Sequence, residues 1–333
     1  MENFYSPLKL SVIVPVYNEE KNIIPFLKRI YSSLKKLDLS YEILFCLDPS
    51  SDCTEAIIRE QMHCNSSIKL IKLSRKFGQP AATIAGILNC KGEACVVIDV
   101  DLQDPPELIK DLYNKINKGY DVVYATRRSR KGESWIKKTI AYLGYMLIAK
   151  LSEVPIPRNT GDFRIMTRRV IEELRQLHEK HGFLRGLVAF VGFRQTFIEF
   201  DREPRLFGKS NYNRYFGALK LAVNGLISFS TRPLQIMSIM GFFIALFGFL
   251  LGGFFLLQKI IGVNLTPGLS STILAITFFS GIQLLFLGLM GEYVGRIYEE
   301  VKRRPMYIID AIIEKKTSSL SELKKEESNK IFL

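Results

Sequence analysis

The stretch Ala94-Cys-Val-Val-Ile-Asp-Val-Asp-Leu-Gln-Asp-Pro-Pro106 decides the fold of this chain. Its apolar run, residues 96–98, is typical of a strand buried on both faces of a parallel sheet. Acidic residues follow directly at Asp99, Asp101 and Asp104, and the proline pair predicts the start of a helix. Open α/β sheets bind ligands beyond the carboxyl ends of their strands. The stretch therefore predicts both the fold class and the position of a site.

Asp99, Asp101 and Gln103 are the candidate metal ligands in this stretch. Two carboxylates and an amide oxygen suit a hard divalent cation, Mg²⁺ or Mn²⁺, with the phosphates of a substrate completing the coordination. A solvated acidic turn is the alternative for an Asp-x-Asp pair alone. That alternative does not explain why the acids interrupt so apolar a strand, so we prefer the metal site.

Strands and helices alternate on either side of the stretch. We expect further strands at residues 10–16, 41–47, 68–73 and 121–126. We expect helices from Asn18, a candidate N-cap, to about residue 34, from the turn at 48–52 to about 61, at 80–88 and from 105 to about 118. This alternation predicts a mostly parallel sheet with helices on its faces and the strand ends on one edge. Neither a dinucleotide-binding glycine motif nor a P-loop motif is present.

The composition bounds the class of partner. The 333 residues carry a formal net charge of +13, which indicates an anionic partner: nucleic acid, a membrane surface or a phosphorylated substrate. The five cysteines form no Cys-x-x-Cys pair and their number is odd, which argues against a disulfide framework or a zinc site. No nucleic-acid-binding module is recognised, so we expect no nucleic-acid partner.

A basic run, residues 127–131, follows the strand expected at 121–126, at the same sheet edge as the acids. It predicts a positive pocket for a second phosphate-bearing substrate, with a solvated charged face as the alternative. Lys137 lies in the amphipathic segment that follows, residues 135–151, where basic and aromatic residues together also suit a membrane interface.

Two uncharged apolar runs, at about residues 234–257 and 271–291, predict membrane-spanning helices, because a span needs about 20 residues. A pair of buried helices in a soluble protein is the alternative. Basic residues flank the pair on both sides, so the positive-inside rule predicts a hairpin with both ends in the cytoplasm. We expect a catalytic domain at 1–210, amphipathic interfacial helices at 211–232, the hairpin at 233–296 and a loose charged cytoplasmic tail at 297–333.

Five motifs along the chain resemble those of family 2 glycosyltransferases, and within them the polyprenyl-phosphate glycosyltransferases. That group includes dolichol-phosphate mannose synthase and, more similar still, the bactoprenol glucosyltransferases. The matching stretches are residues 11–20 (SVIVPVYNEE), 99–107 (DVDLQDPPE), 161–169 (GDFRIMTRR), 183–187 (FLRGL) and 202–210 (REPRLFGKS). With the hairpin they span residues 8–300, and the resemblance implies a GT-A-type sheet that binds a nucleotide-sugar.

The resemblance also implies a role for individual residues. The nucleotide-sugar positions are Pro15, Tyr17, Glu19, Asp48, Asp99, Arg205 and Lys209. The catalytic positions are Asp101, Asp162 and Arg127, the metal ligands are Asp99, Asp101 and Gln103, and the lipid-phosphate positions are Arg127 and Lys137. Each has a structural alternative: Glu19 at a helix N-terminus, Asp162 as an N-cap, Lys137 as a lipid anchor.

The chain departs from the family pattern at three positions. Leu47 and Pro49 stand where relatives have the first Asp and the Gly of an Asp-Asp-Gly-Ser turn, which leaves open which base is read. Asn211 stands where relatives usually have a lysine. Lys209 would then supply the positive charge of that lysine.

The resemblance implies inverting transfer of a hexose from a UDP-sugar, most closely UDP-glucose, to undecaprenyl or another polyprenyl phosphate, with Mg²⁺ or Mn²⁺ as cofactor. GDP-mannose or another sugar donor is the alternative. It further implies an integral protein of the plasma membrane with a cytoplasmic active site, assembled as a homo-oligomer such as a tetramer. A processive polysaccharide synthase is disfavoured, because the only tryptophan, Trp135, is not in a Gln-x-x-Arg-Trp motif. A non-catalytic membrane scaffold is the alternative of a different class.

Overall fold

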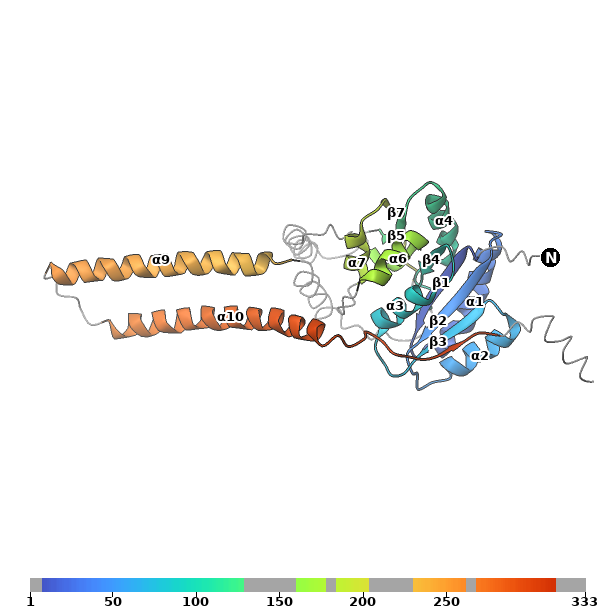
Figure 1. Cartoon of the computed structure of the whole chain (residues 1–333), viewed down its shortest axis with the longest axis horizontal. Helices are drawn as coiled ribbons and strands as arrows, with labels where there is room; N and C mark the ends of the chain where they lie inside the picture. Colours follow the sequence, from blue (N-terminus) through green and yellow to red (C-terminus); the bar gives the residue numbers. More distant parts are fainter. Residues whose placement is uncertain (1–7, 129–159, 178–183, 204–229, 262–267, 316–333) are drawn as a thin grey trace, which may run out of the picture. The chain divides into compact units, whose positions relative to one another are not determined.

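The computed structural model describes residues 8–128, 160–177, 184–203, 230–261 and 268–315 (Figure 1). The chain divides into two compact units. The first takes in the described parts of Met1–Lys138, Ile156–Asn213 and Pro305–Leu333, and the second the described parts of Arg214–Arg304. The first unit contains a sheet with helices on its faces, and the second contains two long apolar helices.

The first unit is built on a mixed, mostly parallel sheet. Its described strands are β1 (Leu10–Val16), β2 (Tyr41–Leu47), β3 (Ile68–Leu73), β4 (Ala94–Val97), β5 (Val122–Arg127), β6 (Thr160–Thr167), β7 (Gln195–Phe200) and β8 (Ile309–Ile313). Their order across the sheet is β7-β5-β6-β4-β1-β2-β3-β8, with β6 and β8 antiparallel to their neighbours. The predicted α/β fold is confirmed, and the bounds of β1, β2 and β3 are those expected from the sequence.

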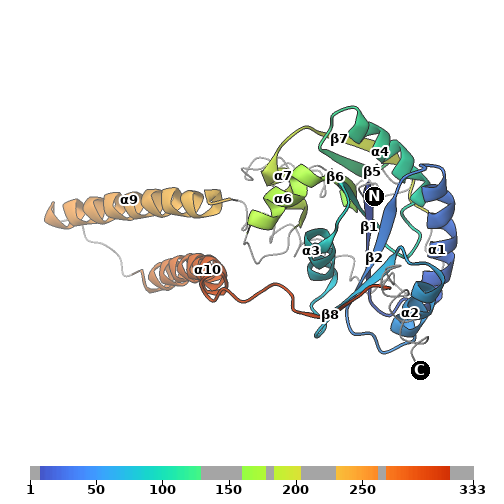
Figure 2. The ribbon, with the colours of Figure 1, turned by 45° about the vertical axis from the view of Figure 1, so that its right-hand side comes forward.

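Helices cover both faces of this sheet (Figure 2). One face carries α1 (Glu20–Lys35), α2 (Thr54–Cys64) and α4 (Ile109–Asn117), the last preceded by the short 3₁₀ helix η1 (Pro106–Leu108), and the other carries α3 (Gln79–Asn89), α6 (Arg168–Gln176) and α7 (Leu184–Val191). Phe26 of α1 meets Phe45 of β2 edge to face, with 6.3 Å between ring centroids. On the other face α3 approaches closely at Gly86, where a Cβ would lie 2.3 Å from Ile13 Cγ2.

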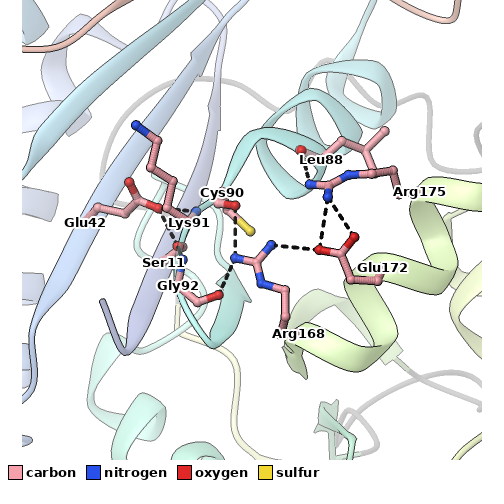
Figure 3. A network of polar contacts seen from close by, with 9 residues as sticks. All are labelled: Ser11, Glu42, Leu88, Cys90, Lys91, Gly92, Arg168, Glu172 and Arg175. Carbon is pink, nitrogen blue, oxygen red and sulfur yellow. Dashed lines mark hydrogen bonds and ion pairs between the residues drawn. The ribbon is translucent and has the colours of Figure 1, made fainter. Parts of the chain in front are cut away.

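A polar network ties α6 to the turn between α3 and β4 (Figure 3). Arg168 donates hydrogen bonds to the carbonyls of Cys90 (3.0 Å) and Gly92. Glu42, which is 2% exposed, accepts hydrogen bonds from the Ser11 hydroxyl (2.6 Å) and the Lys91 amide (2.7 Å). The network lies at the amino ends of β1, β2 and β4, opposite to the predicted site, so we assign it to the fold. All five cysteines of the chain are free.

Asn18 is not the N-cap of α1, contrary to the sequence prediction. Its backbone is left-handed (φ 52°), and its side-chain oxygen accepts the amide N–H of Ser51 at 2.8 Å. The helix begins after Glu19 instead. Asn18 therefore ties the turn after β1 to the turn after β2.

The tail expected to be loose contains a strand, so that prediction is wrong for residues 309–313. β8 runs antiparallel to β3, with Ile313 opposite Leu70. Glu314 then forms ion pairs with Lys91 (3.0 Å) and Lys69 (3.3 Å). The sequence does not predict this strand, because it is short and follows a highly charged stretch. Its hydrogen-bonding partners come from β3, a distant segment of the chain.

The second unit contains α9 (Arg232–Ile260) and α10 (Leu269–Val301). Both contain segments long and apolar enough to cross a membrane, with a mean hydropathy of 2.2, and their large apolar side chains are exposed, as Phe249 is at 83%. The Tyr293 hydroxyl of α10 donates a hydrogen bond to the Ser230 carbonyl (2.9 Å), just before α9 begins. Both helices extend beyond the predicted spans. Of the expected interfacial helices at 211–232, residues 211–229 lie outside the described residues.

Candidate active site

The predicted site residues gather at the carboxyl edge of the sheet. The turns after β1, β2 and β4 leave the sheet at this edge. The parallel strand β5 ends there at Arg127, and the antiparallel strand β6 begins there, with Asp162 near its start. Sequence segments far apart thus meet where open α/β sheets bind ligands.

Four carboxylates at this edge interact electrostatically, and we call them the acid cluster: Asp99, Asp101, Asp104 and Asp162. Burial, followed by the negative charges of the other three, raises the pKa of Asp99 well above its usual range. Burial also raises the pKa of Asp104, whose side chain is 1% exposed, although two arginines oppose the shift. Ionising both acids is therefore costly in the protein alone, and a bound cation would stabilise their charged forms.

The turn after β4 is shaped by its own side chains. Asp101 Oδ1 accepts the backbone N–H of Gln103 at 3.1 Å, the local hydrogen bond that aspartate favours in turns. Leu102 between them is buried and has a left-handed backbone (φ 59°). Strained backbone of this kind is held only where the surroundings fix it, often at functional sites.

Two arginines face the acids. Arg127 Nη2 lies 3.6 Å from Asp104 Oδ1 and packs against Gly161, where a Cβ would come within 2.9 Å of it. Arg202 lies two residues beyond the end of β7 and interacts electrostatically with Asp104. Burial, followed by the charge of Arg127, lowers the pKa of Arg202. Among the described residues, the Nε atoms of both arginines are buried without a hydrogen-bond partner. Such donors suit a phosphate group.

Asp162 is held between two further arginines. Its Oδ1 accepts hydrogen bonds from Arg164 Nη2 (2.9 Å) and Arg185 Nε (3.1 Å). Burial alone would raise the pKa of Asp162, but the charges of Arg185 and Arg164 outweigh it and leave the pKa below its usual value. Asp162 lies inside β6 and α6 begins only at Arg168, so the alternative role as an N-cap is wrong.

Asp48 fixes the turn after β3. Its carboxylate is 2% exposed and accepts the backbone N–H groups of Phe77 (3.0 Å) and Gly78 (2.8 Å). Gly78 has a φ of +94°, which a glycine adopts without strain. The turn sets Lys76 Nζ over the ring of Tyr17, 3.5 Å from its centroid.

Gln79 opens α3 from the same turn and reaches the acid cluster. Its Nε2 donates a hydrogen bond to Asp99 Oδ1 at 2.8 Å. Neither Lys76 nor Gln79 is among the site residues predicted from the sequence. Their position directly after a parallel strand was the signal, because such a turn must lie at the same sheet edge as the acids.

Pro15 and Glu19 lie at the carboxyl end of β1 and just beyond it. Pro15 is buried inside β1, in register with Cys46 of β2. The backbone N–H of Glu19 donates to Thr54 Oγ1 (2.9 Å), and its carboxylate accepts a hydrogen bond from the Asn22 amide. The geometry of Glu19 thus also fits its alternative role at the helix N-terminus.

Asp99, Asp101 and Gln103, the predicted metal ligands, all lie in the turn after β4, and their side-chain oxygens are of the kind that a hard cation prefers. Within the described ranges no three His, Cys, Asp or Glu side chains converge as a protein-only metal site. Mg²⁺ characteristically binds one or two carboxylates and completes its shell with water and substrate phosphates. Nearby, Asp104 Oδ1 is buried without a hydrogen-bond partner among the described residues. The residues present therefore fit a cation that a bound diphosphate helps to hold.

Three predicted site residues, Lys137, Arg205 and Lys209, lie outside the described residues. Arg185 and Arg202 were not predicted as site residues. Both lie inside family motifs, at residues 183–187 and 202–210, and that position was the signal that could have identified them.

Comparison of the sequence with known proteins identifies the family of this chain. The model for glycosyl transferase family 2 matches residues 11–175. An uncharacterized glycosyltransferase of Synechocystis sp. is 45% identical over 303 residues, covering 91% of this chain and 95% of its own. The uncharacterized glycosyltransferase YkcC of Bacillus subtilis is 43% identical, covering 91% and 93%. The bactoprenol glucosyl transferase of Shigella phage SfII is 38% identical, covering 91% and 97%.

Proposed function

This chain belongs to the family 2 glycosyltransferases, and from that premise we propose that it transfers glucose from UDP-glucose to a polyprenyl phosphate such as undecaprenyl phosphate. One observation carries the proposal: four carboxylates, of which that of Asp104 is buried, and the arginines Arg127 and Arg202 share one edge of the sheet. A reaction between a nucleotide-sugar and a lipid phosphate needs sites for a diphosphate and for a second phosphate. The similarity to a bactoprenol glucosyl transferase supports the choice of sugar and acceptor.

The donor occupies the edge from Tyr17 to the acid cluster. In this proposal the nucleoside lies beside Pro15, Tyr17, Glu19 and Asp48, with Lys76 and Gln79 completing that side. Asp99, Asp101 and Gln103 would hold Mg²⁺ or Mn²⁺, which neutralises charge on the departing diphosphate when bound. Arg205 and Lys209 add positive charge to the diphosphate, where negative charge develops as the bond to the sugar breaks.

The acceptor is a phosphate monoester, which is already an anion at neutral pH. Arg127, with Lys137, holds this anion in line with the anomeric carbon, and correct positioning supplies most of the rate. A phosphate oxygen forms the new bond to that carbon while the bond to the UDP oxygen breaks, so the configuration inverts. Asp162 is ion-paired and its pKa is depressed, which suits orienting a sugar hydroxyl better than accepting a proton.

The apolar helices α9 and α10 would anchor the enzyme in the plasma membrane as a hairpin. Both ends and the active site then lie on the cytoplasmic side, where UDP-glucose is available and the head group of the lipid can be reached. Assembly into a homo-oligomer is part of the same proposal.

The test is transfer of radiolabel from a panel of donors to undecaprenyl phosphate by the purified full chain. UDP-glucose, UDP-galactose and GDP-mannose are compared, each with Mg²⁺, Mn²⁺ or EDTA. We expect chloroform-soluble label from UDP-glucose, and its loss with EDTA and in Asp101→Ala. The matched control is Glu55→Gln, which removes an ion-paired acid on α2 that contacts Arg59 and Lys72. Labelling from another donor alone would overturn the choice of sugar. No label from any donor would overturn the proposed function, and retained UDP binding in that case would place the error in the acceptor.

A further inference from the structure

Arg29 of α1 joins two segments that border the acid cluster. Its guanidinium donates to Glu107 of η1 through Nε (2.7 Å) and Nη2 (2.9 Å). It also donates to Glu203, after β7, through Nη1 (2.7 Å) and Nη2 (2.6 Å). Both carboxylates are therefore bound in the bidentate manner that fixes orientation as well as distance.

Glu203 in turn meets the turn that carries the candidate metal ligands. Its backbone N–H donates to the Gln103 carbonyl at 3.2 Å, and Gln103 Nε2 lies 3.5 Å from the Glu203 carbonyl. The neighbouring residue, Arg202, interacts electrostatically with the carboxylates of Asp99, Asp101 and Asp104. Arg29 thus fixes residues 202 and 203. This segment brings the Arg202 side chain to the acid cluster and the Glu203 backbone to Gln103.

Stability alone is a weak explanation for this arrangement. The Arg29 side chain is 27% exposed, and those of Glu107 and Glu203 are 47% and 43% exposed. Ion pairs at such exposure contribute about 0–1 kcal/mol to folding. A bidentate contact between residues 174 positions apart does, however, set the register of two segments.

We propose that Arg29 is a positioning residue for the donor diphosphate, which acts through Glu203 to hold Gln103 and Arg202 at the acid cluster. This inference rests on the proposed function, because it takes the acid turn to be the diphosphate site. Arg29 touches no substrate. Its loss should weaken donor binding while leaving the acceptor site, built around Arg127, unchanged.

The experiment measures kcat and both KM values for the full chain and its variants. We expect Arg29→Met and Glu203→Gln each to raise the donor KM roughly tenfold, a loss of uniform binding, with the acceptor KM within about twofold. Arg29→Lys, which keeps the charge but not the fork, should recover only part of the loss. The double variant should be no worse than the single ones, because both remove the same connection. Glu55→Gln, which removes an ion-paired acid on α2, should leave both KM values unchanged.

The outcomes separate the inference from the proposed function. If the wild-type chain forms no glycolipid from any donor, the proposed function is overturned and the inference falls with it. If wild type is active and Glu203→Gln keeps a wild-type donor KM, or raises both KM values equally, the positioning role is overturned. Should Arg29→Met not fold, Arg29→Lys and Glu203→Gln decide the question. If the Arg29 variants unfold at a lower temperature but keep the wild-type donor KM, the contacts of Arg29 with Glu107 and Glu203 serve only the stability of the fold.

Discussion

Arg185 Nε lies 3.1 Å from Asp162 Oδ1, although the two residues come from a helix and a strand 23 positions apart. Arg164, which is fully buried, reaches the same oxygen at 2.9 Å. One carboxylate oxygen thus faces two cations, so Asp162 stays ionised and keeps a fixed orientation. In the proposed reaction this makes Asp162 a positioning group for the sugar.

Removing this carboxylate should slow the chemical step. We expect Asp162→Asn to lower kcat by roughly a hundredfold, typical of losing one oriented polar contact in the transition state. Arg185→Met should have a smaller effect in the same direction, because Arg164 still holds Asp162. Steady-state kinetics with the full chain measures both. A wild-type kcat in Asp162→Asn would contradict the assignment of Asp162 to the site.

The pH dependence separates a positioning group from a base. An aspartate with a depressed pKa is ionised above its usual value of about 3.9, and it gives up its charge and its share of stability only as the pH falls through the lower folded value. We therefore expect kcat to fall on the acid side of its pH profile near pH 6, where the acceptor phosphate takes up its second proton. This fall is the acid limb of the profile. The residual activity of Asp162→Asn should keep this limb. If the limb disappears in the variant, Asp162 is the titrating base.

Much of the sheet could be read from the sequence, because β1, β2 and β3 are apolar runs bounded by turn residues. The acid turn at 99–104 was equally plain. Partners from distant segments could not be found in this way: Arg29 lies on an ordinary amphipathic helix, and nothing local to residues 29 or 203 indicates that they meet. The strand β8 was not predicted for a similar reason, because its five residues form a strand only by pairing with β3.

β8 offers a test of stability within one strand. Ile313 packs against the hydrophobic core, whereas Ile312 is 48% exposed on the other face. We expect Ile313→Asp to lower the free energy of unfolding of the sheet-bearing unit by about 2 kcal/mol, through lost burial and a desolvated charge. The control Ile312→Asp should change it by less than about 0.5 kcal/mol. Thermal unfolding of the full chain in detergent compares them. Equal effects would mean that β8 does not pair with β3 in this register.

Gly161 tests how closely the position of Arg127 is set. A Cβ at residue 161 would lie 2.9 Å from Arg127 Nη2. The group in its way is the far end of a flexible side chain, so Gly161→Ala should fold with near wild-type stability. The guanidinium must shift, however, and with it the cation that we propose for the acceptor phosphate. We expect the acceptor KM to rise roughly tenfold while the donor KM stays unchanged. In an Arg127→Lys background the guanidinium group is absent. Gly161→Ala should then raise the acceptor KM little further, because the two changes act on one contact. Full additivity would mean that residue 161 acts on the acceptor by a route other than Arg127.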